Sequence, residues 1–355
     1  MPDPIRITDA DLNSPAVNDY VETQKYLSRD ESTEQAPWII RVIYANWFYL
    51  SIAAMIGGLV GWALIEPWFT DEDLADDQFD LAAFLMFPVV AGCVGLFLGA
   101  AEGIICRNPL RAIKCGFTAL GVGFLGGLIA LVPTGMVFTL MSVLAVQLWE
   151  NPQAGAMPTG VALLVLMMGR GAAWAIAAIP AGMGQGIALR ERKIIINGLV
   201  GAVLGGLLGG LLFDPIYLAF VGDTGEADLS RAVGFGVIGL LVGLFVGLVE
   251  GWTKTAWLLM RKGPLAGKQF ILFKDATVMG SSPKADVYLF KDDAIEPRHA
   301  IVTNRGGRFE IEDGNTADGT YVNGVPVKRQ ILHDGDQIVL GKTVLEFSVK
   351  ETKDA

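Results

Sequence analysis

Few residues of this 355-residue chain have the types and spacing that catalysis or metal binding requires. His299 and His333 are the two histidines, and neither has a second ligand at metal-binding spacing. Cys93, Cys106 and Cys115 form no disulfide or zinc pattern. No nucleophile, base and orienting group occur together, and the glycines recur at helical spacing rather than in a phosphate-binding loop. The sequence therefore predicts no enzyme, no metal site and no cofactor.

The acidic run DEDLADDQFD over residues 71–80 is another candidate for cation binding. An EF-hand loop needs alternating oxygen ligands, a central glycine and a distal glutamate. The run has neither that glycine nor that spacing. We therefore interpret it as a solvated extracytoplasmic loop.

Short alternating runs rich in Val, Ile, Tyr and Phe follow one another toward the C-terminus, separated by Gly, Asn and Asp turns. They are ATVMG at 276–280, DVYLF at 286–290, RHAIV at 298–302, FEIED at 309–313, DGTYVNG at 318–324 and DGDQIVLG at 334–341. Runs of this kind predict a small antiparallel β-sandwich.

The order of these motifs, with Gly280, then His299, then Gly319 to Gly324, resembles the forkhead-associated (FHA) domain, a family that binds phosphothreonine peptides. The resemblance covers about residues 265–350. It implies that Gly280, His299, Gly319 and Gly324 are scaffold residues beneath the binding loops. It also implies a set of loop residues that contact a protein or phosphopeptide partner. These are Ser281, Ser282, Lys284, Glu296, Arg298, Thr316, Asp318 and Asn323.

Three loop positions depart from the family pattern. The family usually has Arg where Ser281 stands, a phosphate-binding Ser where Glu296 stands, and Asn where Asp318 stands. A dianionic phosphate is held by charge-assisted donors, chiefly Arg and hydroxyl groups, so two carboxylates oppose it. Lys284 and Arg298 lie close by in the sequence and could compensate in part. Phosphothreonine binding, phosphate-independent binding and an unoccupied structural domain all stay open.

The remainder of the chain is very apolar. Hydrophobic residues make up 52% and charged residues 18%, the mean hydropathy is +0.46, and there are 44 glycines. These values indicate a multi-pass membrane protein packed through small residues. A net charge of −10 without a basic stripe argues against nucleic acid as a partner. Six runs have the length needed to cross about 30 Å of hydrocarbon. They are 47–66, 81–103, 116–135, 171–189, 194–213 and 233–251.

Basic residues follow the second, fourth and sixth spans, whereas acidic residues occupy the other loops. Short basic loops stay in the cytoplasm, so the sequence predicts a protein of the cell (inner) membrane with both termini cytoplasmic. The predicted segments are a flexible acidic segment 1–36, an interfacial anchor 37–46, a membrane domain 47–253, a linker 254–264, an FHA-like sandwich 265–350 and a tail 351–355.

The second, fourth and sixth spans share one frame of aromatic and small residues. Small residues every four positions line one helix face and let backbones approach closely. The frame positions are Arg170, Trp174, Gly182 and Gly186 in the fourth span, and Arg231, Phe235, Gly243 and Gly247 in the sixth. The predicted fold class is thus an all-α transmembrane six-helix bundle of three glycine-rich hairpin repeats, followed by an all-β FHA-like sandwich. This combination resembles bacterial multi-pass membrane proteins with a C-terminal FHA domain.

The second repeat contains a surplus over residues 134–169. The two apolar pieces in it are either extensions of the flanking helices or a re-entrant or interfacial hairpin. Arg170 aligns with Arg231, and we interpret it as an outer-interface residue that snorkels to headgroups or caps a hairpin. Glu102, at the inner end of the second span, is expected to pair with a loop cation such as Arg107.

Two functions are compatible with this organisation. One is a membrane-anchored scaffold or adaptor whose cytoplasmic FHA-like domain recruits a protein or phosphoprotein in signalling. Thr8, followed by Asp11 at plus three, resembles a phosphothreonine motif and could be an internal ligand. The other is a channel or transporter regulated by the FHA-like domain, because repeated hairpins also occur in transporters. Scarce polar residues in the spans weigh against it.

Overall fold

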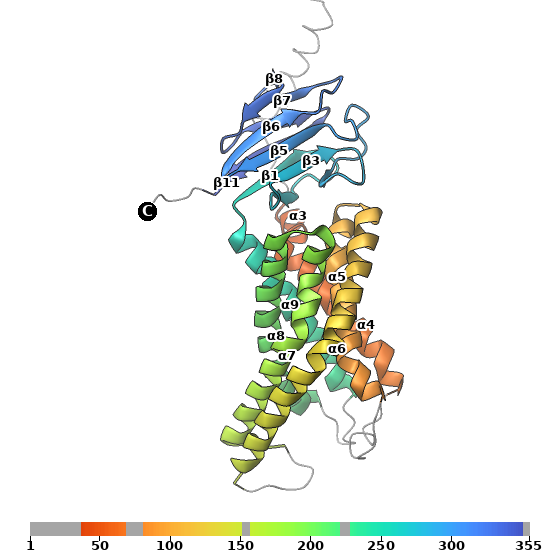
Figure 1. The fold of residues 1–355 in the computed structure, drawn as a ribbon, viewed down its shortest axis with the longest axis vertical. Coiled ribbons are helices and arrows are strands. Elements are labelled where there is room, and N and C mark those ends of the chain that lie inside the picture. Colours follow the sequence, from red (N-terminus) through yellow and green to blue (C-terminus); the bar gives the residue numbers. More distant parts are fainter. Residues whose placement is uncertain (1–36, 69–80, 151–156, 221–227, 351–355) are drawn as a thin grey trace, which may run out of the picture. The chain divides into compact units, whose positions relative to one another are not determined.

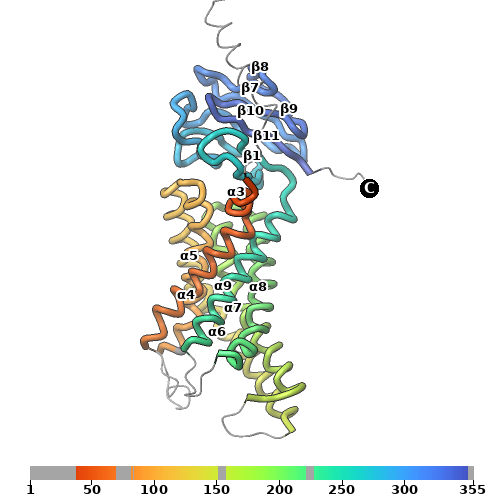
Figure 2. Tube along the Cα trace, turned by 180° about the vertical axis from the view of Figure 1, so that it is seen from behind, coloured from red at the N-terminus to blue at the C-terminus, as the bar shows by residue number. Residues whose placement is uncertain are grey.

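The computed structural model describes residues 37–68, 81–150, 157–220 and 228–350. They belong to two compact units, and each unit is described by itself (Figures 1 and 2). The helical unit is Val42–Lys254, and the other unit contains the β-strands from Thr255 onward together with the described residues up to Arg41. The predictions for the N-terminal segment 1–36 with Thr8, for the acidic run 71–80 and for the tail 351–355 lie outside the described residues.

Seven α-helices occur in the described part of the chain. They are α3 (Trp38–Ile43), α4 (Asn46–Ile65), α5 (Leu81–Ile105), α6 (Pro109–Gln147), α7 (Gly160–Leu189), α8 (Arg192–Phe220) and α9 (Asp228–Thr253). Helices α4 to α9 are long and apolar enough to cross a membrane, which confirms the six predicted helical spans. The expected interfacial anchor contains α3, whose Trp38 and Ile39 side chains are exposed.

The six long helices form three hairpins, α4–α5, α6–α7 and α8–α9. Each helix packs on its neighbours in the chain and α9 packs on α4, so the helices close into a ring. The second helices of the hairpins also contact one another and therefore lie innermost. Their aligned aromatic residues meet there: the ring centroids of Phe87 and Trp174 are 4.8 Å apart, and those of Trp174 and Phe235 are 5.6 Å apart. Aromatic side chains thus fill the middle of the ring at this level.

Close approach between hairpins occurs at the second glycine of each aligned Gly-Gly pair. A Cβ atom on Gly58 would lie 2.3 Å from the carbonyl oxygen of Phe235, and one on Gly206 would lie 2.5 Å from that of Trp174. The equivalent Gly127 would place its Cβ 2.8 Å from the backbone of α5. The same backbone contact is therefore repeated at all three junctions between hairpins.

The frame glycines of the fourth and sixth spans make further close contacts at two of these junctions. A Cβ on Gly182 or Gly186 would come within 2.3 or 2.4 Å of the α8 backbone, and one on Gly243 or Gly247 within 2.1 or 2.4 Å of the α4 backbone. Real Cβ atoms do not approach main-chain atoms so closely, so only glycine permits this helix spacing.

The surplus of the second repeat extends its two helices. Helix α6 is 39 residues long in all and is not interrupted at Pro133. At 1.5 Å per residue its length is about 58 Å. Helix α7 begins only at Gly160, and both views show α6 and α7 projecting past the ends of the other long helices (Figures 1 and 2). The extended-helix alternative is therefore the observed one, and a separate re-entrant or interfacial hairpin is wrong.

Arg170 forms an ion pair with the next hairpin. Its Nε atom lies 2.9 Å from Oδ1 of Asp214, whose side chain is only 1% exposed, although the N–H is not aimed well enough to count as a hydrogen bond. The guanidinium group also lies about 5 Å from the rings of Phe138 and Phe213. These contacts join α7 to its neighbours, so the side chain is held by protein groups instead of reaching for headgroups.

Arg231 repeats this arrangement one hairpin further on. Its guanidinium donates to both carboxylate oxygens of Glu66, with the shortest contact 2.5 Å. In both pairs, the arginine belongs to the second helix of one hairpin, and the acid precedes the closing proline of the next hairpin around the ring. The third pair of this frame would be Ala83 and Val132, where both charges are missing together.

Polar side chains gather at the predicted inner end of the helical unit. Glu102 accepts hydrogen bonds from Arg111 at 2.8 Å and from Gln185 at 3.1 Å. Its partner is thus Arg111 at the start of α6, which is a cation of the predicted basic loop, as expected, although the particular residue is not Arg107. Glu250 accepts a hydrogen bond from Asn46 at 2.8 Å, which joins α9 to α4.

The β unit consists of two sheets packed face to face. In the described residues the strands are β1 (Ala256–Lys262), β2 (Gln269–Ile271), β3 (Ala276–Gly280), β4 (Val287–Tyr288), β5 (Ala300–Arg305), β6 (Arg308–Asp313), β7 (Thr320–Val322), β8 (Val325–Val327), β9 (Arg329–Ile331), β10 (Gln337–Leu340) and β11 (Thr343–Val349). The six-stranded sheet has the order β2-β1-β11-β10-β7-β8, and the five-stranded sheet has the order β4-β3-β5-β6-β9.

The predicted sandwich is confirmed, but the predicted linker is wrong. Residues 256–262 form β1, which pairs with β11 and β2 in the interior of the larger sheet. Alternate residues of this strand are buried, and Leu258 and Met260 are at most 1% exposed. The run was missed because the apolar residues continue almost directly from the last helix. Phe309 and Phe347, 5.3 Å apart, join the two sheets.

The glycine contacts predict a steep response to a single methyl group. Gly243→Ala places its Cβ 2.1 Å from the Leu50 oxygen, and we expect a loss of about 2 kcal/mol in the unfolding free energy in detergent. Gly121→Ala is the control, because its Cβ meets nothing within 4 Å and alanine favours the helix. Equal unfolding curves for the two variants would contradict the close packing.

The Arg170–Asp214 ion pair predicts that removing both charges costs less stability than removing the arginine alone. Arg170→Leu leaves Asp214 buried without its cation and should lower stability by about 3 kcal/mol. Adding Asp214→Leu should restore most of this loss, because the double variant leaves no buried charge without a partner. The aligned positions of the first and second repeats, 83 and 132, are likewise both apolar. Unfolding by detergent titration measures both values. A double variant as unstable as Arg170→Leu would show that the pair is not coupled in this way.

Candidate partner-binding loops of the β-sandwich

All of the predicted loop residues except Asn323 lie in three loops, which follow β3, precede β5 and follow β6. Glu296 connects these three loops. Its backbone oxygen accepts the N–H of Ser281 at 2.9 Å, and its Oε1 accepts the N–H of Ala317 at 3.0 Å. Glu296 is otherwise exposed. A carboxylate thus already occupies a backbone donor within the loops.

His299 lies directly beneath these loops and is fully buried. Its Nδ1 atom lies 3.1 Å from the backbone N–H of Glu296 and accepts that hydrogen bond, so Nδ1 carries no proton. The proton is therefore on Nε2, which donates to the carbonyl oxygen of Gly319 at 3.1 Å. A neutral histidine with both ring nitrogens in use supports the scaffold role that the resemblance implies.

Two of the other scaffold positions favour glycine, one because of a close backbone contact and the other because of a positive φ. A Cβ on Gly280 would lie 2.3 Å from the carbonyl oxygen of Pro297, so the β4–β5 loop approaches β3 closely. Gly324 has φ +78° and follows Asn323 with φ +51°, in a two-residue turn between Val322 and Val325. Positive φ at both positions is typical of a type I′ hairpin.

Asp313 organises the loop after β6. It accepts hydrogen bonds from the hydroxyl groups of Thr320 at 2.7 Å and Thr316 at 2.9 Å, and from the Thr316 backbone at 3.1 Å. Burial by itself would raise the pKa of Asp313, but these hydrogen bonds outweigh it and hold the pKa below its usual value. The hydroxyl proton of Thr316 therefore points to Asp313 rather than to solvent.

The remaining candidates form an electrically balanced rim. Lys284 and Arg298 are exposed and, in the described part of the chain, make no ion pair, while Glu296 and Asp318 are exposed carboxylates. Ser281 and Ser282 are half-buried, and the Ser282 hydroxyl oxygen accepts the N–H of Lys284 at 3.2 Å. The rim thus contains two cations and two carboxylates, and their formal charges sum to zero.

The side chain of Asn323 forms its hydrogen bonds with residues at the start of β10. Its Nδ2 donates to Asp336 at 2.8 Å, and its Oδ1 accepts the N–H of Gln337 at 2.9 Å. Among the described contacts none joins its side chain to Glu296 or His299. Asp313 and Asp336 are the organising residues that the sequence reasoning missed. An aspartate followed at plus three by Thr316 is a turn signal that could have identified the first of them.

Comparison with known proteins defines the class of the domain. Residues 277–341 match the family model described as FHA domain. The "Oxoglutarate dehydrogenase inhibitor" of Corynebacterium jeikeium (strain K411) is 38% identical over 101 residues, which cover 28% of this chain and 67% of that protein. The "Glycogen accumulation regulator GarA" of Mycolicibacterium smegmatis is 38% identical over 100 residues, which cover 28% of this chain and 63% of that protein.

One similar solved structure is that of the FhaA FHA domain complexed with an intracellular domain. It is 28% identical, covers 26% of this chain and 99% of that chain, and has a TM-score of 0.25. The C-terminal sandwich is an FHA domain, and the chain belongs to the family of FHA domain-containing proteins. Only about a quarter of the chain takes part in these matches, and it spans about two thirds of the length of the two relatives.

The histidine contacts predict a large difference between the two histidines of the chain. His299→Ala removes two buried hydrogen bonds and should lower the unfolding free energy of residues 254–355 by about 2–3 kcal/mol. His333→Ala is the control, since that side chain is 78% exposed and its loss should cost less than about 0.5 kcal/mol. Urea denaturation measures both; coincident midpoints would exclude the scaffold role of His299.

Proposed function

We propose that this protein is a membrane-anchored adaptor. Its six apolar helices hold it in the cell membrane, and its FHA domain binds a protein partner in the cytoplasm with little or no dependence on phosphothreonine. The observation that carries the second part is the bond between the Glu296 carboxylate and the Ala317 N–H, 3.0 Å long.

The bond matters because backbone N–H groups and hydroxyl protons are the donors that hold a phosphate. At this end of the sandwich, Glu296 takes the N–H of Ala317 and Asp313 takes the hydroxyl proton of Thr316. An incoming phosphate would meet these carboxylates at short range, where like charges repel. Lys284 and Arg298 supply attraction, but only enough to offset the local acids. A partner with mixed polar groups fits this rim better than a phosphate dianion.

The similar proteins support binding over catalysis. Their names describe an inhibitor and a regulator, and the solved FhaA domain is complexed with another domain. We infer that the present FHA domain likewise works by contact with a protein, which is also consistent with the absence from the sequence of a nucleophile with its base.

The membrane part of the proposal rests on helix length, apolar composition and charge. Lys and Arg residues follow the second, fourth and sixth helices, which favours cytoplasmic termini. The alternative of a regulated channel loses weight because Trp174 and Phe235, which are 5% and 2% exposed, pack in the middle of the ring beside Phe87. An adaptor needs no path through the helices.

Peptide titration tests the mode of binding. We expect residues 254–355 to bind a degenerate phosphothreonine peptide library and its unphosphorylated counterpart with similar, weak affinity in calorimetry. Glu296→Ser should raise the affinity for the phosphorylated library by about tenfold or more, because a hydroxyl donor replaces a repelling charge.

Glu312→Ser is the matched control, as it removes an exposed carboxylate from the sheet and should leave both affinities unchanged. A wild-type domain that prefers the phosphorylated library by a large factor would overturn the phosphate-independent mode while leaving the adaptor role in place. Release of the full-length protein from membranes by alkaline carbonate extraction would contradict the proposal that its helices anchor it there.

A further inference from the structure

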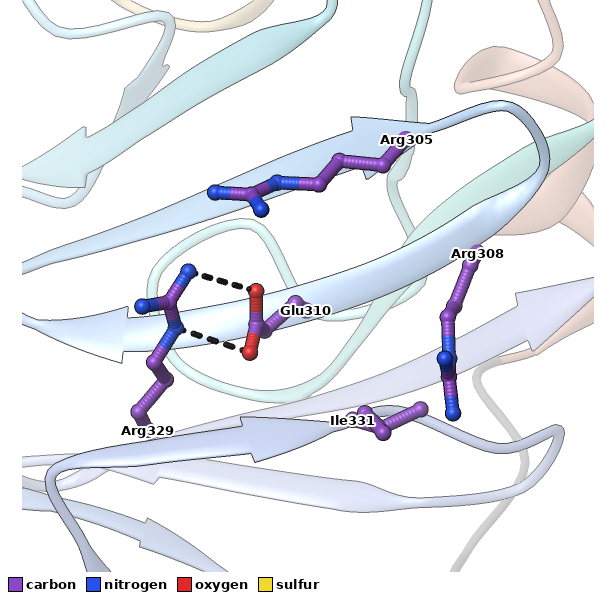
Figure 3. Close-up of a pocket in the computed structure, with 5 residues that line it drawn as sticks. All are labelled: Arg305, Arg308, Glu310, Arg329 and Ile331. Atoms are coloured by element: carbon purple, nitrogen blue, oxygen red, sulfur yellow. Dashed lines mark hydrogen bonds and ion pairs between the residues drawn. The ribbon is translucent and has the colours of Figure 1, made fainter.

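A second charged site lies away from the recognition loops, on the exposed face of the smaller sheet. Arg305, Arg308 and Arg329 surround a shallow cavity of about 330 Å³ together with Glu310 and Ile331 (Figure 3). Arg305 and Arg308 come from the two arms of the β5–β6 hairpin, and Arg329 and Ile331 come from β9. The cavity thus has three guanidinium groups and one carboxylate.

Only one of these arginines is paired. Arg329 binds Glu310 with both ends of its guanidinium, at 2.7 Å from Nε and 2.9 Å from the terminal nitrogen (Figure 3). This ion pair keeps the pKa of Glu310 below its usual value, with Arg305 and Arg308 contributing further. In the described residues, Arg305 and Arg308 form no ion pair of their own, and both are exposed.

The hairpin register makes this arrangement costly without an anion. Arg305 lies directly opposite Arg308 in the antiparallel ladder, so the two side chains share one face. Like charges at directly opposed positions destabilise a strand pair. Figure 3 shows the Arg305 guanidinium directed toward the Arg329–Glu310 pair and the Arg308 guanidinium directed toward Ile331. A phosphate group on either guanidinium would offset the repulsion, and guanidinium groups bind phosphate with two parallel hydrogen bonds.

Chain connectivity indicates where this phosphate would come from. The β5–β6 turn lies at the opposite end of β5 from the recognition loops, because Ala300 begins the strand beside His299 and Arg305 ends it. At that end, the backbone N–H of Asn304 donates to the carbonyl oxygen of Asp275. Slightly earlier in the chain, the backbone N–H of Leu272 donates to the carbonyl oxygen of Ala256, the first residue of β1. The turn is therefore at the end of the sandwich where the chain enters β1.

Only Lys254 and Thr255 separate the last long helix from β1. A link of this length reaches about 10 Å, since an extended residue spans at most about 3.6 Å. Once α9 is inserted in a membrane, this end of the domain cannot leave the headgroup region. Tethering of this kind gives the lipid a high effective concentration, so even weak contacts are occupied.

We propose that Arg305 and Arg308, with Arg329 beside them, bind the phosphate groups of anionic phospholipids in the membrane that anchors the protein. The proposal rests on the membrane insertion that forms part of the proposed function. Within the sandwich, this site and the Glu296 loops lie at opposite ends of β5, so both could be occupied at once.

The test uses the full-length protein in nanodiscs of phosphatidylcholine, with or without phosphatidylglycerol, and amide hydrogen exchange of the β5–β6 hairpin. We expect exchange in this hairpin to be about tenfold slower in the anionic discs, because each arginine near an anionic surface contributes attraction. Arg305→Glu/Arg308→Glu should abolish this difference, and Arg305→Gln/Arg308→Gln should reduce it. Raising the salt concentration should also reduce it.

Lys284→Glu/Arg298→Glu is the matched control, with the same charge change on the same domain at the recognition loops, and it should keep the protection of the hairpin. Equal exchange in the two lipids, or protection that survives Arg305→Glu/Arg308→Glu, would overturn the proposal. So would protection by a soluble oligoglutamate peptide in neutral discs without any effect of anionic lipid, which would identify the site as a peptide surface. A chain that fails to enter nanodiscs would instead contradict the membrane anchor itself.

Discussion

Direct contact between helix backbones is the constraint on which the helical unit depends. In the lipid environment that the proposed function assigns to these helices, hiding apolar surface contributes little, so close contact must stabilise their packing. The glycines at the junctions permit that contact, and they recur in all three repeats at equivalent places. The inward position of Trp174 and the reach of Arg170 to Asp214 both follow from this spacing. A ring with wider junctions would have neither contact.

Periodicity made much of this architecture predictable. Small residues every four positions identified the packed face of each second helix, and the aligned prolines identified three hairpins. The partners of Arg170 and Arg231 were not predictable, because Glu66 and Asp214 precede prolines and look like the ends of spans rather than buried acids. Likewise, uncharged apolar pieces over 134–169 suit an extended helix and a re-entrant hairpin equally well. Strand β1 was not predicted because its alternating apolar residues begin only two residues after the end of the last helix.

In the FHA domain, too, the fold was predictable from the sequence, whereas the partners of individual side chains were not. The order of glycine, histidine and Asn-Gly motifs sufficed for the fold and for the buried place of His299. The sequence showed that carboxylates stand where donors are usual, but it did not show which groups they bind. That Glu296 reaches the Ala317 N–H, and that Asp313 collects two threonine hydroxyls, depends on loop conformations set by tertiary contacts. Pairing between loops is a property of the fold, which residue types at single positions do not encode.

The missing third ion pair makes the three junctions between hairpins unequal. The junction of α7 with α8 and that of α9 with α4 each have one ion pair, whereas the aligned positions of α5 and α6 are Ala83 and Val132. Separating a buried charge from its partner is strongly destabilising. Sliding of α8 along α7, or of α4 along α9, would therefore break an ion pair, whereas sliding of α6 along α5 would break none at the aligned position. Charge thus fixes the axial register at two junctions, and at the third the register depends on backbone packing.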